Sequence, residues 1–291
     1  MLQLVLGDVT LDLRDPDLGL VVQTVDIGAA TPREVVTDLP GQDGSDDQTQ
    51  YFATRVVSIT GVAGPGTAGS RSKVLDLLAP FLGLSVPRPQ LIYALDEDVD
   101  PRYLTLRVGQ WTAPAGPGAA SAFAVQWKCA DPIAYGLALN EVSLPPLTAD
   151  APGWSYPRTY PRSYPVLATG HGSIFAINNG TYPSWPMFRL FGPCGGTQLA
   201  IHWLDPTGIE NLQTQVVIAG LTLAAGTYLE ITSKARTAVL NGDPDANRYS
   251  YVDFGQTTWG PLLPGTNRLR FTASSATTPS ICQILWRDAY L

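Results

Sequence analysis

The chain has 291 residues, of which 45% are hydrophobic and 15% are charged, and its formal net charge is −7 at pH 7. This length favours two domains over one, and the low charged fraction leaves room for surfaces buried against other subunits. The acidic balance argues against tight sequence-independent DNA binding, which needs a surface of lysine and arginine.

The 25 prolines and 28 glycines are scattered along the chain, which favours short strands joined by turns over long helices. The start of the chain lacks the basic region of a signal peptide. No apolar run approaches the ~18 residues of a membrane span. The three cysteines, Cys129, Cys194 and Cys282, are odd in number and far apart. They are therefore predicted to be reduced, buried side chains of a protein made in a cytoplasm.

The first half of the chain is predicted to consist of strands with one helix. Residues 51–61 are rich in β-branched side chains, and apolar residues alternate with others over 104–109 and 123–129. Such alternation places one set of side chains on a buried sheet face. Apolar residues at a spacing of three to four predict a short amphipathic helix over 70–84 that packs on a sheet. Its apolar stripe consists of Val74, Leu75, Leu78 and Leu82.

Acidic residues gather in two segments of this half. The ordinary interpretation is a pair of solvated loops. The sharper interpretation is the lining of a conduit that DNA passes without sticking, because like charges repel phosphate. The candidate residues are Asp43, Asp46 and Asp47 in the first segment, and Asp96, Glu97 and Asp98 in the second.

The composition changes after Tyr135. A Tyr-Pro pair then recurs three times at four-residue spacing, at Tyr156, Tyr160 and Tyr164. Proline at this density blocks helices and sheet ladders and favours extended chain. Residues 141–169 are therefore predicted to be a linker or an arm lying over a surface, with a peptide-recognition ligand as the alternative.

The last portion, residues 170–291, is predicted to contain only strands and turns. Apolar residues alternate with others over 199–203 and 269–273 and share one face over 282–286, and turn signals such as Asn179-Gly180 separate these runs. Many short strands without a helical stretch predict a β-sandwich. Trp203 and Trp286 fall on inward-facing positions of these strands, which favours a role in the core.

The sequence offers little catalytic or metal-binding chemistry. Its two histidines are His171, in a glycine-flanked turn, and His202, at an outward strand position. No nucleophile elbow, zinc-binding histidine pair, P-loop or dinucleotide fingerprint is present. Two oxygen-rich turns, 43–47 and 241–247, lack the glutamate of an EF-hand loop. We therefore expect no enzyme activity, no cofactor and no metal, and a polysaccharide hydrolase lacks a supporting carboxylate pair.

Several turn motifs, taken in order, resemble the distal tail protein family of siphophages. Residues 39–44 read Leu-Pro-Gly-Gln-Asp-Gly before a strand, and residues 129–135 read Cys-Ala-Asp-Pro-Ile-Ala-Tyr. Residues 178–186 read Asn-Asn-Gly-Thr-Tyr-Pro-Ser-Trp-Pro, residues 264–267 read Pro-Gly-Thr-Asn, and residues 286–290 read Trp-Arg-Asp-Ala-Tyr. The resemblance rests on the collinear order of these short motifs over residues 1–135 and 170–291. The Tyr-Pro segment is a departure from it.

The resemblance implies a mainly β protein with an N-terminal, ring-forming belt domain over residues 1–140, containing one short helix, and a galectin-like β-sandwich over residues 170–291. It implies a homo-hexameric ring at the tail tip of the phage virion, made in the host bacterial cytoplasm. The implied partners are the tail tube protein, the tail-tip hub protein, the tape measure protein and receptor-binding proteins. DNA would pass through the channel without specific binding, the acidic segments would face this lumen, and no membrane would be involved.

A carbohydrate-binding adhesin for attachment to the host cell wall is the alternative function. Tryptophan and tyrosine faces stack on pyranose rings, although large aromatic residues of a sandwich more often lie in its core. The candidate glycan or partner contacts lie in the linker and just after it: Trp154, Tyr156, Tyr160, Tyr164 and Trp185.

Overall fold

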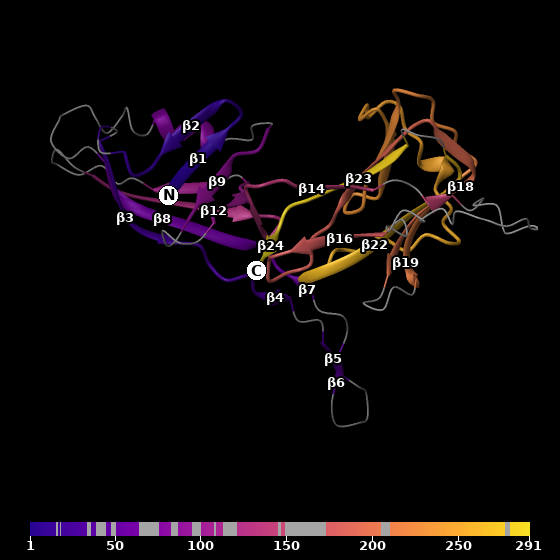
Figure 1. Cartoon of the computed structure of the whole chain (residues 1–291). Coiled ribbons are helices and arrows are strands. Elements are labelled where there is room, and N and C mark those ends of the chain that lie inside the picture. Colours follow the sequence, from indigo (N-terminus) through magenta and orange to yellow (C-terminus); the bar gives the residue numbers. More distant parts are fainter. Residues whose placement is uncertain are drawn as a thin grey trace, which may run out of the picture. The chain divides into compact units, whose positions relative to one another are not determined.

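The computed structural model describes residues 1–15, 17, 19–33, 36–38, 45–47, 51–63, 76–82, 87–94, 100–107, 109–112, 121–144, 147–148, 173–204, 210–276 and 280–291. These residues form two compact units. The first contains Met1–Leu137 with Tyr290–Leu291, and the second contains Ala138–Ala289. Both are built almost wholly from strands (Figure 1), so the prediction of a mainly β protein is confirmed.

The described part of the N-terminal unit contains two main sheets. The first has six strands in the order β2-β1-β9-β10-β13-β24, with bounds β1 (Leu2–Leu6), β2 (Val9–Asp12), β9 (Gln90–Tyr93), β10 (Arg102–Thr105), β13 (Ala134–Gly136) and β24 (Ala289–Tyr290). The second has four antiparallel strands in the order β11-β12-β8-β3, with bounds β3 (Leu20–Asp26), β8 (Arg55–Ala63), β11 (Gly109–Thr112) and β12 (Ser121–Cys129).

Two small antiparallel pairs lie in the connection from β3 to β8. One pairs β4 (Pro32–Arg33) with β7 (Tyr51–Phe52), and the other pairs β5 (Val36–Asp38) with β6 (Ser45–Asp47). The predicted single strand over 51–61 is therefore two strands, β7 and β8, separated by residues 53–54.

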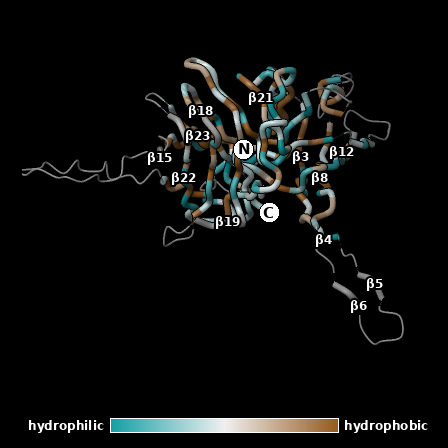
Figure 2. The backbone as a smooth tube through the Cα atoms, turned by 90° about the vertical axis from the view of Figure 1, so that its right-hand side faces the viewer, coloured by the Kyte–Doolittle hydropathy of each residue, from teal (hydrophilic) through white to brown (hydrophobic). Residues whose placement is uncertain are grey.

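Period-two alternation builds the core of this unit. Every second residue of β8 is buried, and Val57, Ile59 and Trp127 belong to one hydrophobic cluster with Leu4 and Leu91 of the other sheet. Figure 2 shows hydrophobic and hydrophilic positions interleaved along the strands. The core thus forms where the apolar faces of the two sheets meet.

Residues 76–82 are the part of the predicted helix that the structure describes, and they do not stay α-helical throughout. Residues 76–78 are helical and continue into a 3-10 turn, η2 (Ala79–Phe81). Pro80 explains this change, because proline cannot donate the hydrogen bond that an α-helix needs. Leu78 and Phe81 are buried, and the Phe81 carbonyl accepts the indole N–H of Trp127 at 3.0 Å. Of the predicted stripe, Leu78 and Leu82 pack on the core as expected, and residues 74–75 lie outside the described residues.

The C-terminal unit is a β-sandwich, as predicted. One sheet has the order β14-β23-β17-β20-β21, with bounds β14 (Asn140–Leu144), β17 (Met187–Phe191), β20 (Tyr228–Thr232), β21 (Thr237–Leu240) and β23 (Ile281–Trp286). The other has the order β15-β22-β18-β19, with β16 also beside β22, and bounds β15 (Leu147–Thr148), β16 (Ser173–Asn178), β18 (Cys194–Leu204), β19 (Glu210–Ala219) and β22 (Gly265–Ala276). A second 3-10 turn, η3 (Tyr249–Tyr251), follows β21.

Aromatic and sulfur side chains fill the two cores as expected. Trp203 and Trp286 are 7% and 5% exposed, and the Trp203 ring packs edge-on against Phe188 at a centroid distance of 5.6 Å. All three cysteines are free and buried. Burial raises the pKa of the Cys129 and Cys194 thiols to about 11, so neither forms a thiolate at neutral pH.

The second unit begins earlier than the sequence indicated. β14 pairs with β23, and β15 pairs with β22 in parallel, so residues 141–144 and 147–148 form strands where a linker was predicted. The missed signal is the alternation of Val142 and Leu144 with polar residues, directly before Pro145-Pro146. The rest of that segment, 149–169, lies outside the described residues. At the other end, residues 290–291 belong to the N-terminal unit.

Candidate assembly surfaces

The sequence motifs of the C-terminal unit converge on one buried asparagine, Asn178, at the end of β16. This side chain is 0% exposed, and its amide donates to the carbonyls of Tyr182 at 2.8 Å and Leu262 at 3.2 Å. Its oxygen accepts the backbone N–H groups of Gly180 at 3.1 Å and Ala289 at 3.4 Å. One amide therefore joins the 178–186 turn to the segment before β22 and to the last strand.

Asp288 holds the same turn. Its carboxylate accepts hydrogen bonds from the Asn140 side chain at 3.1 Å, the Asn179 backbone N–H at 3.1 Å and the Asn179 side chain at 3.3 Å. At Gly180 the backbones are so close that a Cβ would lie 1.9 Å from the Ala289 carbonyl oxygen. The motifs at 178–186 and 286–290 therefore act by fixing the turn against the end of the chain.

The predicted acidic residues are only partly described. Asp46 and Asp47 lie in β6, opposite β5, so the predicted loop over 43–47 is corrected to a strand from residue 45 onward. Asp38 ends β5 and pairs with Ser45. We call β5 and β6, with Asp38, Asp46 and Asp47, the acidic hairpin. The other predicted members lie outside the described residues: Asp43, Asp96, Glu97 and Asp98.

Among the predicted glycan or partner contacts, Trp185 falls in the described part of the chain. It is half-buried just before β17. The structure brings it together with no other member of that set, because Trp154, Tyr156, Tyr160 and Tyr164 lie outside the described residues.

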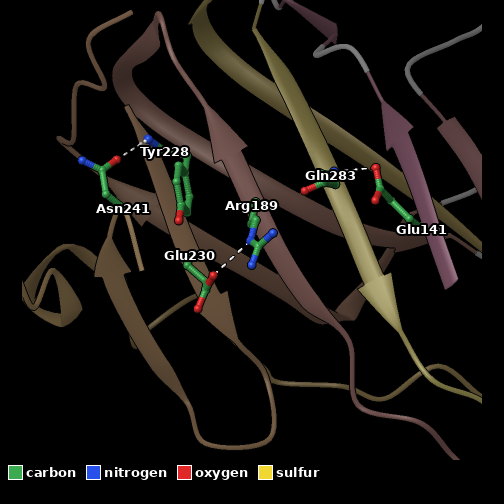
Figure 3. A network of polar contacts seen from close by, with 6 residues as sticks. All are labelled: Glu141, Arg189, Tyr228, Glu230, Asn241 and Gln283. Carbon is green, nitrogen blue, oxygen red and sulfur yellow. Dashed lines mark hydrogen bonds and ion pairs between the residues drawn. The ribbon is translucent and has the colours of Figure 1, made fainter. Parts of the chain in front are cut away.

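The outer face of the sheet that contains β17 is polar and paired within itself. The Arg189 Nε donates to Glu230 at 3.0 Å, with both side chains less than half exposed. A single contact of this kind contributes little to stability, but it gives both charged side chains a partner within the same sheet. Figure 3 shows three such pairs across neighbouring strands: Arg189 with Glu230, Gln283 with Glu141, and the Tyr228 backbone with Asn241.

The other sheet exposes an apolar patch on β16. Phe175 and Ile177 are 57% and 48% exposed, whereas Ala176 and Asn178 between and after them are fully buried. Arg268 of β22 lies beside this patch, with its guanidinium 5.7 Å from the Phe175 ring centre. We call Phe175 and Ile177 the β16 patch. This patch was not predicted from the sequence. The available signal was that the small residue Ala176 and the polar residue Asn178 alternate with the large apolar residues Phe175 and Ile177, so that one of the two sets must face outward.

The outer faces offer no poised catalytic group among the described residues. Both ring nitrogens of His202 lie 3.1 Å from side-chain oxygens, those of Gln215 and Thr272. In the oxygen-rich turn 241–247, Asp243 accepts a backbone N–H at 2.9 Å and Asn247 accepts another at 2.7 Å, which is the ordinary use of such residues in turns.

Among the described residues, no three or more histidine, cysteine or acidic side chains lie together in a way that could hold a metal ion. No helix among them is long and apolar enough to span a membrane. What the described surface does present is strand edges, exposed apolar side chains and charged residues, which are the elements of protein–protein contacts.

Comparison with known proteins agrees with this picture. Residues 179–290 match the family described as siphovirus-type tail component, C-terminal domain. No curated protein matches the chain significantly. Among solved structures, the Dit protein of phage SPP1, described as a paradigm of the hub adsorption apparatus in phages that infect Gram-positive bacteria, is similar at 14% identity with a TM-score of 0.68, and 100% of both chains is covered.

The phage P2 baseplate in its activated conformation is also similar. Its structures with calcium and with strontium each give 13% identity and a TM-score of 0.51, covering 99% of this chain and 98% of theirs. Residues 179–290 therefore match the siphovirus-type tail component family, and the whole chain has a fold similar to that of the SPP1 Dit protein, in agreement with the resemblance that the order of the turn motifs indicated.

Proposed function

We propose that this protein is a structural component of a siphophage tail tip, where six copies form a ring that joins the tail tube to the tip hub. The observation that carries the proposal is the full-length match in fold to the SPP1 Dit protein, because both units are covered. A match limited to the sandwich would support only a binding module. In this proposal the tape measure protein and receptor-binding proteins are further partners, and DNA passes through the ring.

A ring made from one kind of chain needs two different surfaces on each copy, which meet head to tail. The four-stranded sheet of the N-terminal unit supplies such a pair, since β11 and β3 are its two edges. Each edge shows a large exposed side chain, Trp111 at 44% and Val21 at 51%. Pairing β11 of one copy with β3 of the next would extend the sheet from subunit to subunit and cover both edges.

Size-exclusion chromatography with light scattering tests the ring directly. The wild type should elute with a mass about six times 31.1 kDa and appear as a six-lobed ring in negative stain. Trp111→Asp should shift it toward monomers, because it places a charge in the edge contact. Phe254→Asp is the matched control, since Phe254 is similarly exposed but lies in the C-terminal unit. A wild type that stays monomeric at high concentration contradicts the ring.

Attachment to cell-wall sugar is the second candidate function. Phe254 and Tyr251 are 59% and 37% exposed, and the Phe254 ring lies 5.0 Å from that of Tyr249. Aromatic faces grouped on one surface turn suit stacking on sugar rings. Binding on a glycan array that is lost in Phe254→Ala would support this function, and an array without signal would count against it.

A further inference from the structure

One edge of the C-terminal sandwich is open at β16. All six residues of this strand pair with β22 (Figure 1), and no other described strand pairs with it. Ala176 has its carbonyl on the β22 side, where the Asn267 side chain of β22 donates to it at 3.4 Å. Ile177 has its carbonyl on the other side, where it accepts the Trp286 indole N–H at 3.1 Å. Because backbone groups alternate along a strand, those of residues 173, 175 and 177 point to the open edge.

Trp286 closes this edge at one end only. Apart from the Ile177 carbonyl, the outward backbone groups are the N–H of Ile177 and both groups of Ser173 and Phe175. None of them makes a hydrogen bond with a described residue. Such a row of backbone donors and acceptors is a template on which another extended chain can pair.

The other edges of the sandwich are protected. Beside β19, the Asp253 N–H, in the segment after η3, donates to the Val217 carbonyl at 3.0 Å. Beside β21, the Arg248 N–H donates to the Ala238 carbonyl at 2.8 Å. β14 instead carries the exposed and charged side chain of Glu141. β16 has no charged residue, no proline and no break in its register with β22, so it lacks the usual devices that block an edge strand.

Apolar and positive side chains accompany this open edge. Phe175 and Ile177, the β16 patch, are 57% and 48% exposed. Arg268, opposite Phe175 on β22, donates to the Ser173 hydroxyl at 3.2 Å and forms no ion pair among the described residues. The described carboxylates of this unit lie on the other sheet or in turns: Glu141, Glu230, Asp243, Asp245, Asp253 and Asp288. The positive charge beside the patch therefore has no described carboxylate to pair with.

We propose that β16 holds an extended segment of a second protein, which adds to the sheet as a further strand and carries an apolar and an acidic side chain two residues apart. Residues two apart on a strand face the same side. Both side chains would therefore lie on the outer face, where the apolar one covers the β16 patch and the carboxylate pairs with Arg268. The added strand would lie roughly 10 Å from β22, at ~4.8 Å for each strand, and a glutamate and an arginine side chain can bridge this distance.

Charge favours a different protein over a second copy of the same edge. Two β16 strands placed side by side would bring two Arg268 side chains onto one face, where like charges repel. In an added strand, main-chain hydrogen bonds supply affinity and the alternate side chains supply specificity. The inference rests on the proposed scaffold function and deepens it, because it names how a partner protein is held on the C-terminal unit.

A synthetic peptide of alternating design tests the contact. The acidic peptide, Thr-Val-Thr-Glu-Thr-Val-Thr-Glu, presents valine and glutamate on one face. One control peptide has lysine in place of glutamate, and the other has methylated backbone nitrogens and so lacks the N–H donors. Saturation-transfer NMR, which observes the peptide, measures binding to the whole protein. The acidic peptide should bind the wild type, and both controls should bind at least about 10-fold more weakly.

Variants of the protein test whether this binding occurs at β16. Phe175→Thr should weaken binding of the acidic peptide by about 10-fold, because it removes the apolar contact. Arg268→Glu should reverse the preference, so that the lysine peptide binds better than the acidic peptide. Arg248→Glu is the matched control, because Arg248 belongs to the same unit but lies beside β21, and it should behave like the wild type.

Three results would overturn the proposal. They are equal binding of the acidic peptide and its controls, a preference that Arg268→Glu does not reverse, and no binding of the acidic peptide at about 5 mM. Light scattering adds a fourth. If Phe175→Thr has a lower mass than the wild type, another copy of this chain occupies β16, and the second protein is excluded. A wild type that stays monomeric removes the proposed ring, whereas the peptide result still reports on β16, so the two failures are distinguishable.

Discussion

Replacing Asn178 with alanine should markedly destabilise the C-terminal unit. The change removes one fully buried amide and, with it, four hydrogen bonds to backbone groups. Those four groups come from the 178–186 turn, from the segment before β22 and from the last strand. The turn and the end of the chain would therefore lose their common attachment.

The magnitude follows from the groups left behind. Two carbonyls and two N–H groups would lose the Asn178 side chain, although the Leu262 carbonyl would keep its hydrogen bond from the Ser184 N–H at 2.8 Å. Each buried group left without a hydrogen bond costs roughly 1–3 kcal/mol. Relaxation, and water entering the space of the lost amide, reduce this sum, so we expect a loss of about 3–5 kcal/mol in the free energy of unfolding. For a domain of this size, that loss lowers the thermal midpoint by on the order of 10 °C.

Urea denaturation followed by hydrogen exchange in β17 and β23 measures this loss in the C-terminal unit alone. Asn179→Ala is the matched control, because Asn179 is exposed and its side chain contacts only Asp288 in the described structure. It should cost less than about 1 kcal/mol. Equal losses for the two variants, or a loss below 1 kcal/mol for Asn178→Ala, would refute the reasoning.

Three further predictions concern local features. Gly180→Ala should destabilise the same unit by at least about 2 kcal/mol in urea denaturation, because its Cβ would overlap the Ala289 carbonyl; a neutral result would mean that the two backbones separate easily. Burial raises the pKa of the Cys129 thiol from 9.0 to about 11, so stability should be unaffected below pH 9 and fall between pH 9 and 11, where only the unfolded thiol has lost its proton. Between pH 9 and 11, the free energy of unfolding measured in urea should fall by roughly 2–3 kcal/mol less for Cys129→Ala than for the wild type. The same pH dependence in both proteins would contradict the prediction. Arg189→Met should cost under about 1 kcal/mol, because its pair with Glu230 is partly exposed; a larger calorimetric loss would show a network effect.

The sequence was informative where one local pattern determines one structure. Alternation in residues 123–129 predicted β12 and the burial of Trp127, and the same reasoning placed Trp203 and Trp286 in the sandwich core. Within the helix predicted over 70–84, the described residues change to a 3-10 turn at Ala79–Phe81, because the apolar spacing was weighed without Pro80. β14 was missed because five strand residues stand next to a proline pair and gain their stability from β23, far along the chain.

Long-range partners explain what the sequence left open at the sites. Asn178 stood in a recognised turn motif, but its contacts with Leu262 and Ala289 are 84 and 111 residues away. Arg55 carried a readable signal, since it has the same strand parity as the buried Val57 and Ile59. A charged residue on an inward face calls for a partner, although no local pattern shows whether the partner lies in the same chain.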